Sequence, residues 1–217
     1  MKPVPLDRPA AFLSDVHGNA RALDAVLNEL RTLGIEHIFV AGDLLFGGDE
    51  PLRTWRRLRE VGARCVRGAS DTALATIDPA SLRPCDDRER AQAERFARTR
   101  AALGDLVCAE LRRLPDMLRI PMIDGGEIVL VHGSPVDPLV EIGFELDDEE
   151  IAARIGDDPA DVVVCGASHV PFDRMVGEVR VVNVGSVGQA PGGGHAHYTV
   201  LTPRYGGPLV EQYHVAY

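Results

Sequence analysis

Carboxylate and imidazole side chains stand directly after several short apolar runs of this sequence: Asp15, His17, Asp43, His132 and His169. Asp15 and His17 are two residues apart, so both can turn toward one ion from a single loop. A carboxylate in a neighbouring loop can bridge that ion to a second one. Mixed Asp and His ligands suit Mn, Fe or Zn. These residue types therefore predict a transition-metal site.

The elements that must position these side chains alternate between strand and helix in the first part of the chain. Short apolar runs predict strands at 10–13, 37–40 and 63–66, and apolar residues at helical spacing predict helices at 19–31 and 51–61. This β-α-β-α-β order implies a parallel sheet with right-handed crossovers. Sites of α/β folds lie at the carboxyl ends of such strands, where the aspartates of this sequence stand.

A long charged helix and a region rich in strands follow. Residues 88–114 have a helical pattern, and the residues expected on its buried stripe are Phe96, Leu103, Val107 and Leu111. After this helix, strands are predicted at 117–123, 127–131, 162–165, 180–183 and 198–201. We expect these strands to form a second, more antiparallel sheet, and residues 147–155 to form a short acidic helix.

Composition limits the class of protein. The 217 residues suit one domain covering 1–217, and 45% hydrophobic with 26% charged residues is a globular balance. No apolar run long enough to span a bilayer and no signal peptide are recognised, so a cytoplasmic protein without membrane contact is expected. A net charge of −10 disfavours stable nucleic-acid binding. Four scattered cysteines without a CxxC spacing indicate reduced, buried thiols. Association into a homo-oligomer stays open.

Six motifs follow one another along the chain: LSDVHGN, AGDLLFGG, VRGASD, LVHGSPVDPL, GASHVPF and NVGSVGQ. In this order they resemble the calcineurin-like metallophosphoesterases, and most of all the small bacterial phosphodiesterases of the YfcE-like group. The similarity runs from Ala11 to about Leu201. It implies an α/β fold, a four-layer α/β/β/α sandwich of two mixed sheets, with the metal ions at one rim.

Two of these motifs depart from the family pattern. The third usually reads Gly-Asn-His-Asp or Gly-Asn-His-Glu, but here Gly68 is followed by Ala69, Ser70 and Asp71. The resemblance therefore implies that a ligand of the second metal is lost at Ala69. It also implies that Ser70 replaces the histidine that steadies the transition state or protonates the leaving group. The fifth motif, usually Gly-His-Thr-His, has Ala167 in place of another ligand of the second metal.

Carried over position by position, the resemblance leaves one complete site and one impaired site. The ligands expected at the first site are Asp15, His17, Asp43 and His169, whereas the second keeps only the bridging Asp43 and His132. We therefore expect one Mn, Fe or Zn ion per chain, and an empty relic is the alternative. His195 and His197 are either substitute ligands or the polar face of a strand, and Arg67 is either a phosphate contact or part of a surface ion pair.

Two functions follow from this site. The first is a metal-dependent phosphoesterase, a phosphodiesterase or phosphatase acting on a phosphorylated small molecule, in which the ion lowers the pKa of a water that attacks phosphorus in line. His132 and Asp71 would support the ligands or contact phosphate, and Ser70 in place of histidine would slow esters with poor leaving groups most. The alternative is a weak or inactive pseudoenzyme that binds a phospholigand or a partner, since all three substitutions fall within the site.

Overall fold

The computed structural model describes residues 5–217, whose strands form two mixed five-stranded sheets. The first sheet begins with three parallel strands, β1 (Ala10–Leu13), β2 (His37–Val40) and β3 (Arg64–Cys65). Helices α1 (Ala20–Thr32) and α2 (Pro51–Glu60) connect them. This confirms the predicted β-α-β-α-β order and brings the ends of β1 and β2 side by side.

The end of the chain completes the first sheet. Strand β9 (His195–Thr202) pairs antiparallel with β1, and β10 (Leu209–Ala216) pairs with β9, so the order is β10-β9-β1-β2-β3. The prediction that residues 198–201 belong to the second sheet is wrong, because their backbone pairs with the open edge of β1. Strand β10 is not predicted, since its largely exposed side chains give no apolar run.

The second sheet contains β4 (Met117–Pro121), β5 (Glu127–Val131), β6 (Val162–Cys165), β7 (Phe172–Val176) and β8 (Val179–Asn183). Their order is β4-β5-β6-β8-β7. The outer pairs are antiparallel and the two inner pairs are parallel. The expected excess of antiparallel pairing is therefore wrong, because β6 and β8 are joined by a crossover through β7. The predicted acidic helix is α5 (Asp148–Ile155).

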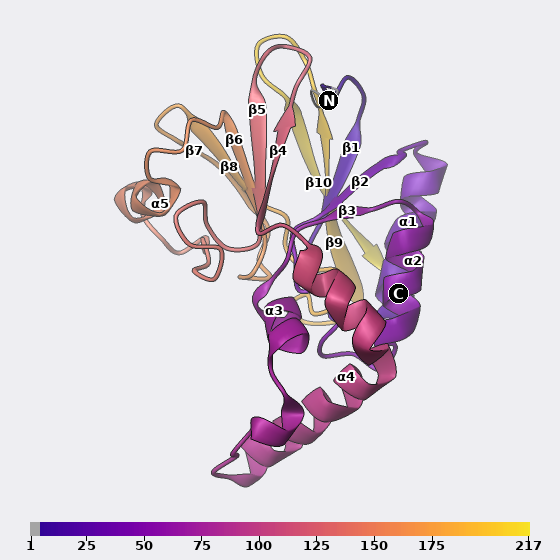
Figure 1. The fold of residues 1–217 in the computed structure, drawn as a ribbon. Helices are drawn as coiled ribbons and strands as arrows, with labels where there is room; N and C mark the ends of the chain where they lie inside the picture. The colour runs from indigo at the N-terminus through magenta and orange to yellow at the C-terminus, as the bar shows by residue number, and fades with distance from the viewer. Residues whose placement is uncertain (1–4) are drawn as a thin grey trace.

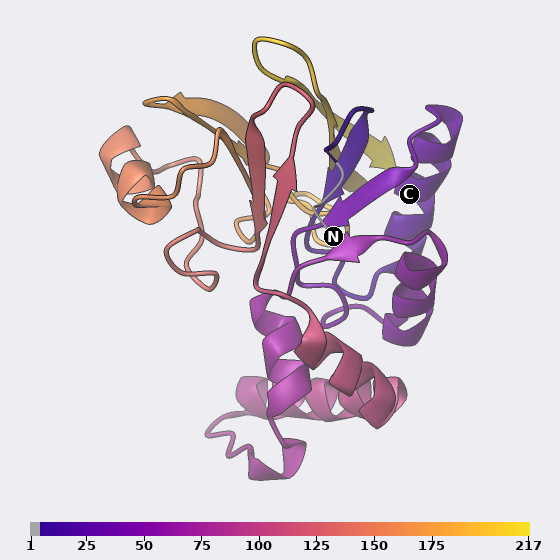
Figure 2. The same ribbon diagram turned by 45° about the horizontal axis from the view of Figure 1, so that its top comes forward.

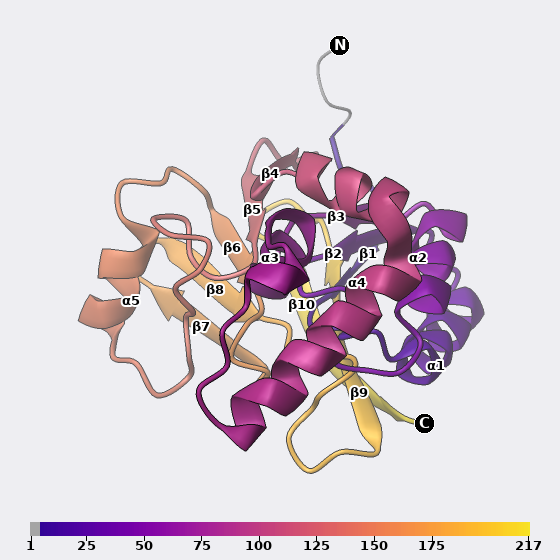
Figure 3. The same cartoon turned by 60° about the horizontal axis from the view of Figure 1, so that its bottom comes forward.

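Three helical segments connect the two sheets: α3 (Ala69–Thr76), the 3₁₀ helix η1 (Pro79–Ser81) and α4 (Asp87–Arg113). Helix α4 bends at Gly104, where φ is +72°. All four residues expected on its apolar stripe are buried. Figure 3 shows α3 and α4 lying across the ends of the sheets. None of the helices in the described chain is long and apolar enough to cross a membrane.

The layers of the sandwich are separated by three apolar cores. One lies between the first sheet and helices α1, α2 and α4, where Leu23 and Leu58 are buried. The second lies between the sheets and contains the stacked rings of Phe12 and Phe39, 5.1 Å apart. The third packs Ile151 of α5 against the second sheet. Figures 1 and 2 show α1 and α2 on one side of the molecule and α5 on the other, as the four-layer arrangement requires.

The cysteines occupy unlike environments. Cys65, Cys108 and Cys165 are buried, and burial raises the pKa of the Cys65 and Cys165 thiols to about 12. Cys85 is exposed in the segment between η1 and α4. The expectation of buried thiols is therefore wrong for Cys85, because this residue belongs to none of the three cores.

Candidate metal centre

The backbone of the predicted ligands is unusual. Asp15, His17, Asp43 and His169 have φ angles of +54°, +50°, +52° and +62°. Ala167, at +66°, is the one other non-glycine residue with a positive φ in the described part of the chain. This conformation is unfavourable for residues with a Cβ and persists where surrounding structure enforces it. The strain is therefore concentrated at the candidate ligands, and Ala167 shares their backbone geometry without having a ligand side chain.

Backbone hydrogen bonds hold the loops after β1 and β2 together. The amide of Asp15 donates to the carbonyl of Gly42 at 3.0 Å, and that of His17 donates to the carbonyl of Asp43 at 3.0 Å. The loop after β6 joins them, because the Ala167 amide donates to Oδ2 of Asp15 at 3.0 Å. Three loops that are distant in sequence are thus fixed around one carboxylate.

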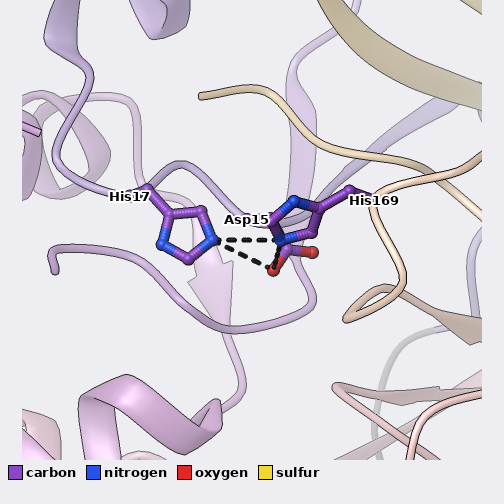
Figure 4. Close-up of side chains that lie close together, drawn as sticks. All are labelled: Asp15, His17 and His169. Carbon is purple, nitrogen blue, oxygen red and sulfur yellow. Dashed lines mark hydrogen bonds and ion pairs between the residues drawn. The ribbon is translucent and has the colours of Figure 1, made fainter. Parts of the chain in front are cut away.

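The three side chains drawn in Figure 4 form a compact group. Asp15 Oδ1 lies 3.2 Å from His169 Nε2 and 3.5 Å from His17 Nε2, and the two Nε2 atoms are 3.2 Å apart. Ligands about 2.0–2.1 Å from an ion lie roughly 3.3–3.4 Å from one another in a tetrahedral shell. The atoms therefore have the mutual spacing of ligands around one metal ion.

Hydrogen bonding also fits a cation at this position. His17 Nδ1 lies 2.7 Å from the carbonyl oxygen of Phe46, to which it can only donate, so the Nε2 of a neutral imidazole carries a lone pair. That lone pair faces Asp15 Oδ1, an atom that is buried and has no well-formed hydrogen bond. A buried carboxylate oxygen that faces the lone pairs of imidazole nitrogens is unfavourable unless a positive charge lies between them. These donors therefore fit a divalent metal ion.

The pKa shifts of Asp15 and His17 also indicate that this site favours a positive charge. Burial opposes ionisation of Asp15, yet the imidazoles of His169, His17 and His132 hold its pKa well below its usual range. Burial likewise opposes protonation of His17, yet Asp15 and Asp43 raise its pKa above the ordinary value of 6.5. A proton on His17 and a metal ion beside it are thus competing ways to balance the same carboxylates.

A second group overlaps the first. One ligand atom each from Asp15, Asp43 and His132 lie within 4.8 Å of one another, and His132 Nε2 is 3.5 Å from Asp43 Oδ1. His132 Nδ1 lies 2.7 Å from the carbonyl of Ala41, so its Nε2 is directed toward the carboxylates. Asp15 thus belongs to both groups, whereas Asp43, expected at the first site, is grouped with His132.

Asp71 lies behind the site. Its side chain is fully buried and accepts hydrogen bonds from the amides of Leu44, at 3.0 and 3.2 Å, and Gly68, at 3.1 Å. Burial and the charge of Asp43 raise its pKa to about 7 against these hydrogen bonds. Of the roles expected from the sequence, support of the ligand loops fits these contacts, because Asp71 joins the Asp43 loop to the start of α3.

Ser70 lies in the first turn of α3, a helix that the sequence pattern does not predict. Its amide donates to Asp43 Oδ1 at 2.9 Å, while its Oγ is buried and has no hydrogen-bond partner. The helix begins at Ala69, and Asp71 in its first turn accepts a hydrogen bond from the amide of Gly68.

The remaining candidates lie elsewhere. The ring of His195 is 4.9 Å from that of His197 and 5.9 Å from that of His214, on strands β9 and β10. Neither His195 nor His197 joins the two groups of potential ligands, so these contacts fit the alternative of a polar strand face. Arg67 pairs with Asp116 at 2.6 Å, which fits the alternative of a surface ion pair.

Sequence reasoning missed two residues that shape the site. Asn183 is fully buried, and its Nδ2 donates to the carbonyl of Gly166 at 2.7 Å and to Ser168 Oγ at 3.0 Å, which holds the loop of His169. A Cβ at Gly68 would lie 2.2 Å from Asp43 Oδ1, so glycine is required there. Asn183 begins the motif NVGSVGQ, and this was the available signal.

A family model settles the ancestry of this arrangement. Residues 10–205 match the model of the calcineurin-like phosphoesterase superfamily domain. The chain belongs to this superfamily. The match confirms the resemblance drawn from the six motifs, and it includes all the candidate ligands. Calcineurin-like phosphoesterases are metal-dependent, in agreement with the donor set described above.

Individual proteins resemble the chain over most of its length. The uncharacterized protein MJ0912 of Methanocaldococcus jannaschii is 26% identical over 194 residues, which cover 82% of this chain and 76% of that protein. The crystal structure of the hypothetical protein PH1004 from Pyrococcus horikoshii has a TM-score of 0.80 and 26% identity, covering 96% of this chain and 88% of that one. YfcE, a phosphoesterase from E. coli, has a TM-score of 0.52 and 22% identity over 89% of this chain and 87% of its own. This last similarity shows the fold alone.

Proposed function

We propose that the chain is a metal-dependent phosphoesterase that holds one firmly bound Mn, Fe or Zn ion. The observation that carries the proposal is the group formed by Asp15 Oδ1 and the Nε2 atoms of His17 and His169, in which a buried carboxylate oxygen lacks a hydrogen bond. Asp43 would complete this ligand set from the loop after β2. The second position has Asp43, His132 and the shared Asp15, while Ala69 and Ala167 offer no lone pair, so it would be occupied more weakly.

Each side chain has a role in this proposal. A divalent ion, when bound, supplies Lewis acidity toward water and the phosphoryl group. Asp15, His17 and His169 would hold that charge, and His132 would contact a phosphoryl oxygen. Asp71 positions Asp43 from behind. Ser70 is a much weaker proton donor than an imidazolium, so the enzyme is expected to favour phosphoesters whose leaving group needs no protonation.

The test combines metal content and turnover. Protein purified without a metal-chelating tag is stripped with a chelator and reloaded with Mn, Fe or Zn, and hydrolysis of an aryl phosphodiester and an aryl phosphomonoester is followed. We expect turnover that depends on added metal and that His169→Ala abolishes. As a control, His214→Ala removes an exposed imidazole on β10 and should leave turnover unchanged. Metal-loaded protein that hydrolyses neither ester would contradict the proposal.

A second candidate is a pseudoenzyme that binds a phospholigand. The observation that favours it is Ala167, which keeps a left-handed φ of +66° although the ligand expected from the family is absent. Such a protein would bind metal and a phosphate analogue at the same loops without turnover. The reloaded protein distinguishes the two candidates, because both predict metal binding and the first alone predicts hydrolysis.

A further inference from the structure

A cavity of about 480 Å³ opens beside Asp43, between the metal centre and the helices that connect the sheets. Ala69, Ser70 and Ala73 line it from α3. Phe46 and Phe96 line it as well, and their rings meet edge to face with centroids 5.8 Å apart. Cavities of this size accommodate small organic molecules. Its lining is thus mainly aromatic and aliphatic, and its polar residues are Asp43, Ser70, Arg83, Glu89 and Gln92.

The cavity is continuous with the metal centre. Asp43 and Ser70 line it, and the same two residues line a neighbouring hollow of about 490 Å³ that includes His17. The amide of Ser70 donates a hydrogen bond to Asp43 Oδ1, so a residue that lines the cavity directly contacts a candidate ligand. A phosphoryl group held beside Asp43 would therefore direct one of its substituents toward the cavity.

Small side chains create this space. Ala69 and Ala73 are one helical turn apart, so they present two adjacent methyl groups on one face of α3. Ser70 lies beside them. Asparagine and histidine at positions 69 and 70, as in the motif that this sequence resembles, would extend into the mouth of the cavity. The substitutions that remove a metal ligand and a proton donor thus also open an apolar space.

Positive charge surrounds the outer part of the site, although the chain carries a net charge of −10. Arg88 and Arg95 line the hollow next to the metal centre, and Arg83 lines the cavity, which has Glu89 as its acidic residue besides Asp43. Arg95 is oriented toward the site by its hydrogen bond to the carbonyl of Gly47, at 3.1 Å. The electrostatic environment thus suits an anion, and the space behind it suits an apolar group.

We propose that this cavity binds the organic group of the substrate, and that the substrate is a phosphoester bearing an aryl-sized apolar group on phosphorus-bound oxygen. The proposal rests on the proposed function for the position of the phosphoryl group. It deepens that function by assigning the specificity to Phe46, Phe96 and Ala73. An apolar group bound in the cavity would bury part of its surface away from water, which contributes to affinity.

Binding of phenylphosphonate and methylphosphonate tests this inference separately from catalysis. Both carry the same anionic head, neither has an ester bond to hydrolyse, and only the first has a ring for the cavity. Calorimetry on the metal-loaded, full-length protein should show that the affinity for phenylphosphonate is at least about tenfold higher than that for methylphosphonate. Ala73→Leu fills the cavity and should remove this difference while methylphosphonate binding changes less than about twofold.

Two further variants complete the experiment. Ala93→Leu fills the cavity from α4 and should act like Ala73→Leu, which provides a second test if the first variant folds poorly. Ala101→Leu makes the same change on the exposed face of α4 and should behave like the unmodified protein. Equal affinity for the two phosphonates, or a preference that survives both cavity-filling variants, would overturn the inference even if esters are hydrolysed. A preference for phenylphosphonate without any hydrolysis would support the inference and contradict the proposed function.

Discussion

The Nε2 atoms of His17 and His169 lie 3.2 Å apart, although 152 positions separate the two residues in the chain. When both imidazoles are neutral and donate from Nδ1, two lone pairs and the buried oxygen of Asp15 meet with no hydrogen between them. Such an arrangement is costly unless a cation occupies the space between the three atoms. The strained backbone at all three residues indicates that the loops are built to maintain this arrangement.

The first prediction concerns metal content. Asp15, His17 and His169 form one group of well-placed donors, which Asp43 would complete. The other group lacks side-chain ligands at Ala69 and Ala167, so we expect close to one transition-metal ion per chain. Elemental analysis of tag-free protein measures this number directly. Two tightly bound ions would contradict it. Replacement of His195 and His197 by Ala would then show whether these residues rearrange to supply ligands.

The second prediction concerns Asp43. We expect Asp43→Asn to weaken metal binding by at least about tenfold, because the substitution removes one of the two carboxylates at the centre while keeping the side-chain shape. The metal-dependent rise in melting temperature should shrink accordingly. Metal titration and thermal unfolding measure both effects. Asp116→Asn, which removes a carboxylate of an exposed ion pair, is the control. Unchanged metal content in Asp43→Asn would indicate that the loops are a relic.

The third prediction concerns pH. The pKa of His17 is raised above 6.5, so in metal-free protein its pairing with Asp15 stabilises the fold fully below pH 6.5 and is lost as pH rises through the raised pKa. Metal binding requires the neutral imidazole and therefore has the opposite dependence. We expect the difference in melting temperature between metal-loaded and metal-free protein to grow as pH rises through this range. A difference that is constant across it would show that His17 is not a ligand.

Much of this architecture follows from local sequence patterns. The strands that precede the candidate ligands are short apolar runs, and the buried stripe of α4 has clear helical spacing, so both can be predicted. The motifs around Asp15, Asp43 and His132 identify the family because their order is specific. These features depend on residues that are close together in the sequence.

The features that could not be predicted depend on contacts between distant segments. Strand β10 exposes most of its side chains, so its sequence has no apolar pattern that would predict its pairing with β9. Helix α3 has little apolar periodicity and is fixed by hydrogen bonds from Leu44 and Gly68 to Asp71. The cavity beside Asp43 is formed where Phe46, α3 and α4 meet, and no single one of these segments specifies it.

The last prediction asks whether three side chains separate this chain from a two-metal phosphoesterase. The triple variant Ala69→Asn, Ser70→His and Ala167→His restores the family residues. Ala167 already has the left-handed backbone of the retained ligands, so a histidine there needs no change of the main chain. Positions 69 and 70 border the cavity, which provides space for larger side chains. We expect two bound ions and a rise in aryl phosphodiester turnover of orders of magnitude, since about 1.4 kcal/mol of transition-state stabilisation corresponds to tenfold in rate.

The same variant should lose part of the selectivity proposed for the cavity, because asparagine and histidine would narrow its mouth. Turnover of an aryl diester with Mn, metal content, and the ratio of phenylphosphonate to methylphosphonate affinity are measured for the natural and triple-variant proteins. The single variant Ala167→His, which does not border the cavity, is the matched control: it should strengthen binding of a second ion while leaving that affinity ratio unchanged. If the triple variant folds and binds two ions but hydrolyses nothing, the site differs from that of an active phosphoesterase beyond these three residues, and the pseudoenzyme is the better description.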